Sequence, residues 1–334
     1  MAIRVAINGF GRIGRNLLRV CLQRQDLEVV ALNDLVPAAT NAHLLRYDST
    51  HGRLGMPVTH SDRAITVGGR EIATFAERDP KALPWDDLGV DVVAESTGRF
   101  TDASEAAAHL DAGARRVVIS APATGADATI VVGVNDDSYD AQRHRIVSNA
   151  SCTTNCIAPM VKVLDDAFGV EHGLMTTVHA STNDQNLLDL AHKDLRRARA
   201  AGVNIVPSTT GAARATSLVM QSMKGRLDGS ALRVPVIDGS ITDLTAVVGR
   251  PVDITEINGA FRAAATEGSL AGVLVYTEEP IVSSDIVGSP ASCTFDSLLT
   301  MTMGSLVKVF GWYDNEWGYS QRLADLVGIV GRGL

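Results

Sequence analysis

Short apolar runs alternate with amphipathic segments through the first 150 residues of the chain. Each run has the length of a β-strand, and the segments between them are long enough for helices, such as the one predicted from Ala103 to Ala112. Buried apolar strands separated by helices predict a doubly wound parallel sheet. The predicted strands are Ile3–Ile7, Glu28–Leu32, Asp91–Ala94, Arg116–Ser120, Ile130–Val134 and one that ends at Val147.

The pattern changes from Ser151 onward. A predicted helix, Thr153–Phe168, and a predicted strand, Gly173–His179, precede a long polar and basic stretch without regular periodicity, Ser181–Val206. The strands that follow are linked by turns and one helix, which predicts an α+β unit with a mostly antiparallel sheet and helices on one face. These segments are the strands Leu232–Val236, Ser240–Val248, Gly272–Val275, Ser292–Leu298 and Leu306–Trp312, the helix Ile254–Ala265 and a final helix, Trp317–Val330.

The two patterns are interpreted as two domains, because 334 residues are too many for one ordinary hydrophobic core. Residues 1–150 form the doubly wound domain, and residues 151–316 form the α+β domain. The helical segment within 317–334 is expected to return to the first domain.

The composition of the chain argues against several classes of function. A hydrophobic content of 46% with 20% charged residues is typical of a soluble globular protein. The formal net charge of -8 argues against nucleic-acid binding as the main function, because phosphate backbones recruit basic surfaces. No segment approaches the roughly 20 apolar residues of a membrane span. The four cysteines do not form a disulfide framework, so a cytoplasmic location is expected. No metal site is predicted.

A glycine motif directly follows the first predicted strand. Gly9, Gly11 and Gly14 fit the pattern G-x-G-x-x-G between a strand and an amphipathic helix. The first glycine permits the tight turn, the second lets the backbone approach a pyrophosphate, and the third allows close packing of helix and strand. The second strand leads to Asp34, an acid about 20 residues after the last glycine. A carboxylate there accepts hydrogen bonds from ribose hydroxyls and repels a 2′-phosphate, so a Rossmann domain that prefers NAD to NADP is predicted.

One cysteine stands where a helix is predicted to begin. Cys152 lies between the strand that ends at Val147 and the helix that contains Ile157. Unpaired backbone N–H groups and the positive end of the helix dipole favour a thiolate at such a position. The usual cysteine pKa of about 8.5 is therefore expected to fall by one or more units. Cys152 is a candidate nucleophile.

His179 ends a predicted apolar strand, where its imidazole could meet Cys152. An imidazolium stabilises a thiolate, and a neutral imidazole takes protons from reacting hydroxyl groups. The hydroxyl and N–H groups of Pro207–Ala213, at another helix start, are candidates for binding phosphate-type anions, with Arg233 supplying charge.

These residues resemble the phosphorylating glyceraldehyde-3-phosphate dehydrogenases along essentially the whole chain. The cysteine and tryptophan motifs are highly specific. The segments that carry the resemblance are Asn8–Arg15, Ala150–Cys156, Thr176–His179, His192–Arg199, Arg233–Pro235 and Trp312–Tyr319. The resemblance implies NAD as cofactor, D-glyceraldehyde 3-phosphate and inorganic phosphate as substrates, and a place in glycolysis and gluconeogenesis. It also implies a homotetramer in which the loop Ser181–Val206 packs across a subunit interface near NAD.

The resemblance also implies residue roles. Cys152 attacks the aldehyde carbon, His179 activates the thiol, and a thioester forms that phosphate attacks. Thr182 and Arg233 would hold the substrate phosphate, and Ser151, Thr153, Thr210, Gly211 and Arg233 the attacking phosphate. The implied cofactor site comprises Asn8, Gly9, Phe10, Gly11, Arg12, Ile13, Gly14, Asp34, Arg78, Ser96, Ser120 and Asn315.

The sequence departs from the family pattern at two positions beside the site. Ser181 replaces a common tyrosine, and Ala191 replaces a common proline near the adenosine ribose of the neighbouring subunit. These departures suggest a variant isoform with altered inhibitor or cofactor tolerance. Asp34 and Leu35, which would crowd a 2′-phosphate, still favour NAD.

Other activities share parts of this pattern. Erythrose-4-phosphate dehydrogenase uses the same thioester with hydrolysis in place of phosphorolysis, but the intact segment Thr210–Ala213 favours phosphate as the acceptor. Non-phosphorylating aldehyde dehydrogenases have a different glycine pattern and a carboxylate base. A non-catalytic nucleotide-binding interaction protein would not need Cys152, His179 and Arg233 together.

Overall fold

The computed structural model describes residues 2–334, which separate into two compact units. One unit comprises residues 2–130, 137–150 and 320–334, and the other comprises residues 131–136 and 151–319. No helix among the described residues is long and apolar enough to cross a membrane.

The first unit is built on a nine-stranded sheet in the order β3-β4-β5-β2-β1-β6-β7-β9-β8. The strands from β5 onward in this order pair in parallel, whereas β3, β4 and β5 pair antiparallel. Its strands are β1 (Ile3–Asn8), β2 (Leu27–Asn33), β3 (Val58–His60), β4 (Ala64–Val67), β5 (Arg70–Phe75), β6 (Val92–Glu95), β7 (Arg116–Ile119), β8 (Ala128–Thr129) and β9 (Ile146–Ser148), and its helices are α1 (Arg12–Cys21), α2 (Ala38–Arg46), α3 (Ala103–Ala106) and α4 (Ala108–Asp111).

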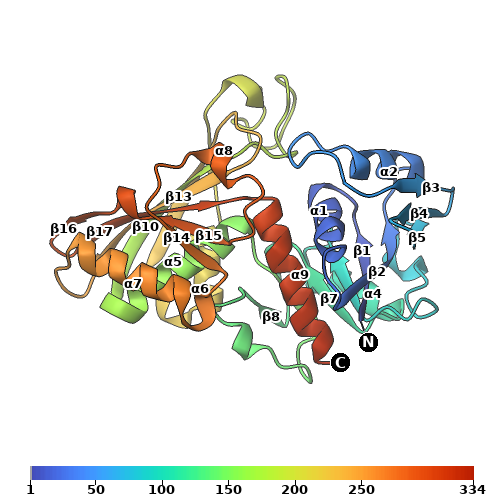
Figure 1. Ribbon diagram of the computed structural model, residues 1–334, viewed down its shortest axis with the longest axis horizontal. Helices are drawn as coiled ribbons and strands as arrows, with labels where there is room; N and C mark the ends of the chain where they lie inside the picture. Colours follow the sequence, from blue (N-terminus) through green and yellow to red (C-terminus); the bar gives the residue numbers. More distant parts are fainter. Residues whose placement is uncertain (1) are drawn as a thin grey trace. The chain divides into compact units, whose positions relative to one another are not determined.

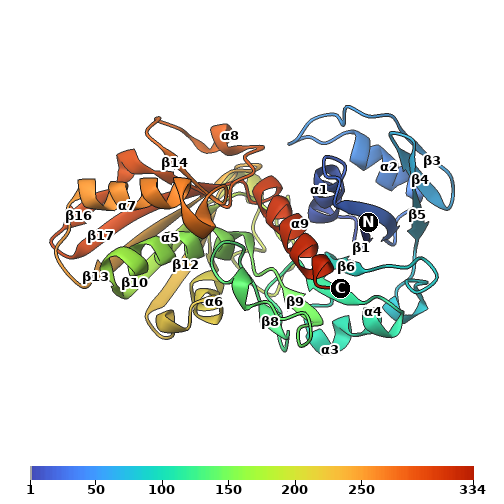
Figure 2. The same cartoon turned by 60° about the horizontal axis from the view of Figure 1, so that its bottom comes forward.

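The second unit contains a sheet with antiparallel pairs at its centre, where β13 lies between β10 and β17 (Figure 1). Helices α5 and α7 pack on one of its faces (Figure 2). The strands are β10 (Val170–His179), β11 (Val206–Thr209), β12 (Leu227–Arg233), β13 (Ser240–Val248), β14 (Leu274–Thr277), β15 (Cys293–Asp296), β16 (Met301–Met303) and β17 (Leu306–Tyr313), and the helices are α5 (Cys152–Phe168), α6 (Ala212–Val219), α7 (Ile254–Thr266) and α8 (Ser283–Ile286).

The last helix, α9 (Trp317–Arg332), runs from the end of the second unit into the first. Within the first unit, the Arg24 guanidinium donates to the carboxylate of Asp325 in α9 at 2.6 Å. Val327 and Val330 on the same helix are fully buried. The C-terminal residues of the chain are thus part of the core of the N-terminal unit.

Alternating burial explains why the central sheet of the second unit has one covered and one open face. Met175, Leu244 and Val309 point into the core beneath α5. On the other face Leu174 is 68% exposed, and Asp243 binds Lys308 across two neighbouring strands at 2.5 Å. A shallow groove of about 900 Å³ lies on this open face.

Three predictions of secondary structure are wrong. The run Ile130–Val134 is buried in part but forms a turn, in which the Asn135 side chain accepts from the Val131 N–H at 2.8 Å. The helix predicted over Ala103–Ala112 is divided at Ala107 into α3 and α4. The strand predicted at Leu232–Val236 instead runs from Leu227 to Arg233, and its continuation contains a proline that lacks the N–H needed for a ladder.

Candidate active site

Cys152 is the first residue of α5. Ser151 is the N-cap, and its hydroxyl oxygen accepts the Thr154 N–H at 3.0 Å. The preceding residue, Ala150, has φ of 55°, and among the described residues it is the only non-glycine residue with a positive φ. The sharp turn from β9 into the helix therefore carries backbone strain directly before the cysteine, as is common at functional sites.

His179 and Arg233 are placed side by side by strand register. Each is the last residue of its strand, and β10 and β12 run parallel with His179 opposite Arg233. The imidazole Nε2 lies 3.5 Å from the Cys152 Sγ. The Nδ1 atom lies 2.8 Å from the Ala180 carbonyl oxygen and 2.5 Å from Arg233 Nη1. The structure thus brings a thiol, an imidazole and a guanidinium together.

The contacts of the His179 Nδ1 atom determine which ring nitrogen carries the proton, and these contacts depend on the position of Arg233. A guanidinium only donates hydrogen bonds, so Nδ1 accepts from Arg233 in this conformation. The ring proton of the neutral imidazole is then on Nε2 and faces the sulfur of Cys152. If Arg233 turns toward an anion, Nδ1–H can donate to the Ala180 carbonyl instead, which makes Nε2 a proton acceptor. The same three groups therefore support both proton arrangements.

The expected lowering of the Cys152 pKa is wrong for this conformation. Burial raises the pKa of the Cys152 thiol to about 11, although the Arg233 charge and hydrogen bonds at the helix start lower it. Burial and the Arg233 charge lower the pKa of His179 to about 3. Desolvation outweighs the helix amides, so the pair rests as a neutral thiol and a neutral imidazole. Cys152 keeps part of its surface exposed, so solvent still helps to stabilise a thiolate when one forms.

A buried hydroxyl network supports the catalytic pair. The Tyr313 hydroxyl lies 2.8 Å from Thr153 Oγ1 and 2.8 Å from Thr177 Oγ1. The Tyr313 ring meets the His179 ring edge-on, with centroids 5.9 Å apart. Burial raises the pKa of Tyr313, which keeps its hydroxyl neutral. Tyr313 lies in the Trp312–Tyr319 motif that carries the family resemblance, but that motif gave no indication of a hydrogen-bonding role for its hydroxyl group.

The remaining predicted phosphate ligands have local partners in the structure. The Thr182 hydroxyl donates to Asp184. Thr210 Oγ1 accepts the Ala212 N–H at 3.2 Å, and Gly211 is the N-cap of α6. Their grouping with Arg233 around phosphate remains a prediction.

A cofactor-sized pocket of about 580 Å³ lies in the first unit, at the carboxyl ends of β1, β2 and β6. Ligands of doubly wound sheets bind at such strand ends. Six predicted cofactor residues line it, namely Asn8, Gly9, Gly11, Asp34, Arg78 and Ser96. The pocket is also lined by Leu35, which was expected to crowd a 2′-phosphate, and by residues that were not among the predicted cofactor ligands, namely Asn33, Glu77, Thr97, Arg99, Phe100 and Glu105. Several of these directly follow predicted strand ends, which is the signal that could have identified them.

The three motif glycines fit a dinucleotide. A Cβ on Gly9, which has φ of +93°, would come within 2.5 Å of the Thr97 nitrogen. A Cβ on Gly14 would come within 2.2 Å of the Gly9 carbonyl oxygen. A Cβ on Gly11 would meet no protein atom within 4 Å, so this position faces the open space that a pyrophosphate requires. The chain thus has the geometry of a glycine-rich cofactor turn.

The other predicted cofactor residues support this turn or lie outside the pocket lining. One carboxylate oxygen of Asp34 accepts the Phe10 N–H at 2.7 Å. Arg12 is bound to Asp48 at 2.5 Å, and Ile13 and Gly14 belong to α1. Ser120 directly follows β7. Asn315 belongs to the second unit, where its side-chain oxygen accepts from the Ser240 hydroxyl at 2.7 Å.

Comparison with known proteins shows the family of the chain. Residues 3–103 match the model of the glyceraldehyde 3-phosphate dehydrogenase NAD binding domain, and residues 151–315 match that of the C-terminal domain. The chain belongs to the glyceraldehyde-3-phosphate dehydrogenase family. It is 60% identical to glyceraldehyde-3-phosphate dehydrogenase 2 of Streptomyces avermitilis, with 100% of both chains covered. The corresponding proteins of Mycobacterium avium and Geobacillus stearothermophilus are 59% and 56% identical over 100% of both chains. This family member is an NAD-dependent oxidoreductase.

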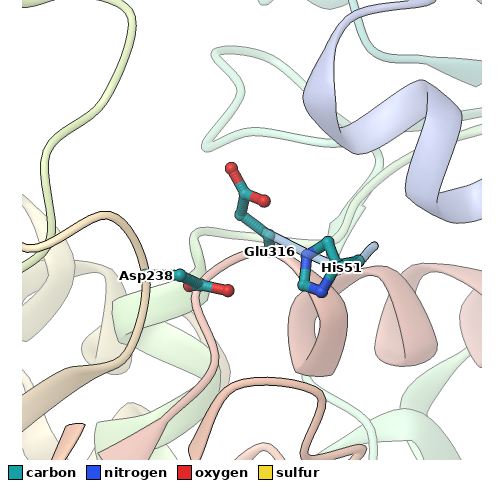
Figure 3. A group of neighbouring side chains, drawn as sticks. All are labelled: His51, Asp238 and Glu316. Atoms are coloured by element: carbon teal, nitrogen blue, oxygen red, sulfur yellow. The ribbon is translucent and has the colours of Figure 1, made fainter. Parts of the chain in front are cut away.

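The catalytic unit of this dehydrogenase family member also contains a buried carboxyl pair next to Asn315. Asp238 and Asp314 are each 1% exposed. Asp314 accepts the backbone N–H groups of Gly288, Glu316 and Trp317. Burial, the Asp314 charge and hydrogen bond, and the nearby Glu316 (Figure 3) raise the pKa of Asp238 to about 8. Asp238 therefore keeps its proton to a much higher pH than an ordinary carboxyl group does.

We expect Asp238 to make the stability of the protein fall as the pH rises through about 8. Its folded-state pKa lies above the unfolded value of about 3.9, so its stabilising contribution is complete below that value, declines progressively as the pH rises, and is fully lost once the pH passes the folded-state pKa of about 8. Asp238→Asn should remove this loss, and urea unfolding midpoints at pH 6 and pH 9 measure it. The exposed Asp87→Asn is the control. An equal fall for wild type and Asp238→Asn would contradict the expectation.

Proposed function

We propose that this protein catalyses the NAD-dependent oxidative phosphorylation of D-glyceraldehyde 3-phosphate to 1,3-bisphosphoglycerate. The observation that carries the proposal is the Cys152 Sγ atom 3.5 Å from His179 Nε2, with Arg233 Nη1 2.5 Å from the other ring nitrogen. A nucleophile, a base and an anion-binding group are thus present in one place.

The chain's own residues supply most of the chemistry. Cys152 attacks the aldehyde carbon to form a thiohemiacetal, and His179 Nε2 takes the proton of its hydroxyl group. Bound NAD serves as the hydride acceptor. The product on Cys152 is a thioester, which retains the energy of oxidation because no hydrolysis has taken place. Inorganic phosphate attacks this thioester, the acyl phosphate leaves, and Cys152 is regenerated as the leaving group.

Arg233 links substrate binding to proton transfer. Its Nη1 group lies 2.5 Å from His179 Nδ1 and 3.2 Å from the Ala180 carbonyl oxygen, and its Nε atom is buried without a hydrogen-bond partner. A phosphate dianion offers acceptors for both groups, in the bidentate geometry that arginine favours. Movement of Arg233 toward phosphate would free Nδ1 to donate to the Ala180 carbonyl, 2.8 Å away. Substrate binding would thereby convert His179 Nε2 into the base.

The proposal includes a homotetramer in the cytoplasm. The loop Ser181–Val206 exposes several leucines, among them Leu187 at 83% and Leu195 at 81%. The open sheet face exposes Leu174 at 68% beside the groove of about 900 Å³. Large exposed apolar side chains gathered on two surfaces are typical of subunit contacts. The four free cysteines suit a reducing compartment.

The proposed reaction is tested by following the absorbance of reduced nicotinamide with glyceraldehyde 3-phosphate, with and without inorganic phosphate, using NAD and NADP in parallel. We expect turnover that requires phosphate and prefers NAD, because Asp34 repels a 2′-phosphate. Phosphate-independent turnover would favour the hydrolytic activity on aldose phosphates such as erythrose 4-phosphate. Light scattering on the same preparation is expected to give four copies of the 35.3 kDa chain.

We also propose that this protein is a variant isoform with altered inhibitor tolerance, because Ser181 replaces the tyrosine that is common in the family. The Ser181 N–H donates to the Val236 carbonyl at 2.9 Å, and its hydroxyl donates to the Val234 carbonyl at 3.0 Å, so it lies along the segment after Arg233. We expect Ser181→Tyr to change the inactivation rate by a thiol-directed electrophile, because the larger ring occupies space beside this segment. Equal rates for wild type and Ser181→Tyr would count against this role.

A further inference from the structure

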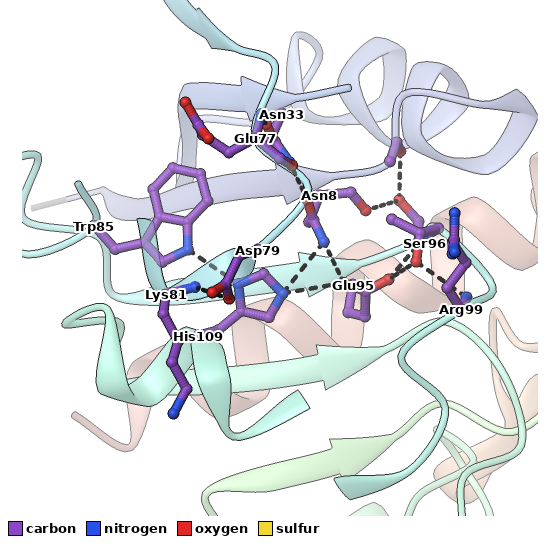
Figure 4. A network of polar contacts seen from close by, with 12 residues as sticks. Asn8, Asn33, Glu77, Asp79, Lys81, Trp85, Glu95, Ser96, Arg99 and His109 are labelled. Atoms are coloured by element: carbon purple, nitrogen blue, oxygen red, sulfur yellow. Dashed lines mark hydrogen bonds and ion pairs between the residues drawn. The ribbon is translucent and has the colours of Figure 1, made fainter. Parts of the chain in front are cut away.

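Glu95, the last residue of β6, is a charged side chain buried beside the cofactor pocket. The Glu95 side chain is 1% exposed. Asn8, which lines the pocket, is also 1% exposed. Figure 4 shows Glu95 between Asn8 and His109, with further contacts that continue on either side. The reaction proposed above assigns no role to Glu95 or His109. Burying a carboxylate is costly unless its oxygens are well bonded, so its bonding pattern requires an explanation.

The hydrogen bonds around His109 fix its protonation. Trp85 Nε1–H can only donate, and it lies 3.1 Å from His109 Nδ1, which must therefore accept. A histidine with a lone pair on Nδ1 carries its proton on Nε2. That N–H points at Glu95 Oε2, 3.0 Å away. His109 is thus a neutral imidazole that donates to Glu95.

Glu95 is held as a carboxylate by donors alone. Its Oε2 atom accepts from His109 Nε2 and from Asn8 Nδ2 at 2.5 Å. Its Oε1 atom accepts from the Thr97 N–H at 2.8 Å and from the Thr97 hydroxyl. A proton on Oε2 would face two donors, and a proton on Oε1 would conflict with the Thr97 N–H. Glu95 therefore carries a full negative charge that only neutral groups compensate.

The network extends from Glu95 to a second segment of the pocket. Asn8 Oδ1 accepts from Asn33 Nδ2 at 2.7 Å, which leaves each side-chain amide only one orientation. Asn33 in turn binds both the N–H and the carbonyl of Glu77, at 2.8 and 2.9 Å. Asn33 directly precedes Asp34, and Glu77 directly precedes Arg78. The bonds thus connect the glycine turn, the ribose-binding acid and the Arg78 segment.

We propose that Glu95 is a positioning residue that preorganises the NAD pocket, and that its negative charge is what sets the hydrogen-bond direction of Asn8, Asn33 and Thr97. Four donors converge on one carboxylate, so no neutral side chain of the same shape can satisfy them all. A network in which every member has one allowed role holds its segments in one arrangement. The pocket then binds NAD without first reordering its walls.

Glu95→Gln tests this proposal. The new amide N–H₂ would face either the donors from Asn8 and His109 or those from Thr97. The free protein can relieve this conflict by shifting Asn8 or Thr97, and NAD binding must then reverse the shift. We expect the Kd and KM for NAD to rise about 5-fold to 150-fold, as for one unpaired buried polar group. The kcat at saturating NAD and the KM for the aldehyde should remain unchanged.

A reciprocal exchange separates positioning from a general loss of stability. Asn8→Asp combined with Glu95→Gln moves the carboxylate to residue 8, where it can accept from the glutamine amide, from Asn33 and from His109 Nε2, 3.3 Å from the present Asn8 nitrogen. We expect this double variant to bind NAD more tightly than Glu95→Gln alone. Thermal unfolding of each variant shows whether it is folded, and the exposed Glu71→Gln is the matched control.

The possible outcomes are distinct. Wild-type NAD affinity in Glu95→Gln, or a double variant no better than the single one, would overturn the proposal. If Glu95→Gln does not fold, Thr97→Val removes the hydroxyl group that donates to Glu95 and accepts the Arg99 N–H at 3.0 Å. It should weaken NAD binding several-fold, and unchanged binding would again overturn the proposal. NAD affinity is measured by direct titration, so these results do not depend on which aldehyde the enzyme oxidises.

Discussion

Replacement of Cys152 by serine is expected to lower kcat by at least about 10⁴-fold, which is the order of magnitude for loss of a catalytic nucleophile. A serine hydroxyl at this position ionises far less readily than the thiol and would form an ester in place of a thioester. His179 Nε2, at 3.5 Å, would have to remove a proton from a much weaker acid. The measurement is steady-state formation of reduced nicotinamide in the presence of phosphate.

Cys156→Ala is the matched control for Cys152→Ser. Cys156 lies one helical turn further along α5, is fully buried, and directs its thiol toward the Gly311 carbonyl oxygen at 3.5 Å. Its removal should lower stability through lost packing and leave kcat within a few-fold of wild type. Titration of NAD should give close to wild-type affinity in Cys152→Ser, since Cys152 is not one of the predicted cofactor residues and the residues that line the cofactor pocket belong to the other unit. Substantial phosphate-dependent turnover in Cys152→Ser would disprove the thioester mechanism.

Much of the fold follows from periodicity, because burial and backbone geometry agree in the strongest segments. The strand Ser240–Val248 alternates strictly between buried and partly exposed residues, and its predicted bounds match the structure. The helix Ile254–Thr266 begins with a capping box formed by Asp253 and Glu256, and the prediction differs by one residue at its end. Where local signals and burial point the same way, a single sequence is sufficient.

The errors arise where burial and backbone geometry disagree. Ile130 and Val131 are fully buried, yet the chain turns there because the Asn135 side chain replaces a strand partner for the Val131 N–H. Conversely, Asp228–Ser230 resembles a turn in sequence but extends β12. Pairing with β10 on one side and β11 on the other determines that conformation. A single sequence does not contain these long-range pairings.

The residues of the candidate site also fall into two groups, those that a local sequence pattern indicates and those that are brought together only by long-range contacts. Cys152 and Asp34 were predicted because each follows a local pattern, a helix start and a strand end. The contact between His179 and Arg233 depends on the register of two strands that are separated by about 50 residues, which periodicity does not specify. The roles of Tyr313 and Glu95 depend on side chains from distant segments. The direction of the Cys152 pKa shift was predicted wrongly for a related reason. A sequence indicates where the amides of a helix start lie, but it does not indicate how far a nearby thiol is desolvated.

Arg233→Gln is expected to lower kcat/KM for the phosphorylated aldehyde by about 10²-fold or more, because two charge-assisted hydrogen bonds to an anion are lost. The same change should affect the thiol. The Arg233 charge opposes the effect of burial on the Cys152 pKa, so its removal should move that pKa further upward. The pH at which iodoacetamide alkylates Cys152 at half its maximal rate should therefore be higher in Arg233→Gln than in wild type.

Arg233→Lys separates these two contributions. A lysine retains the positive charge near Cys152 but lacks the planar fork that binds phosphate in a bidentate manner. We expect the pH midpoint of alkylation in Arg233→Lys to stay close to that of wild type while the KM for the aldehyde remains raised. If the midpoint in Arg233→Gln equals that of wild type, the guanidinium does not tune the thiol, and its contact with His179 Nδ1 at 2.5 Å serves substrate binding alone. A shifted midpoint together with an unchanged KM would place the substrate phosphate elsewhere and leave Arg233 as an electrostatic partner of the Cys152 and His179 pair.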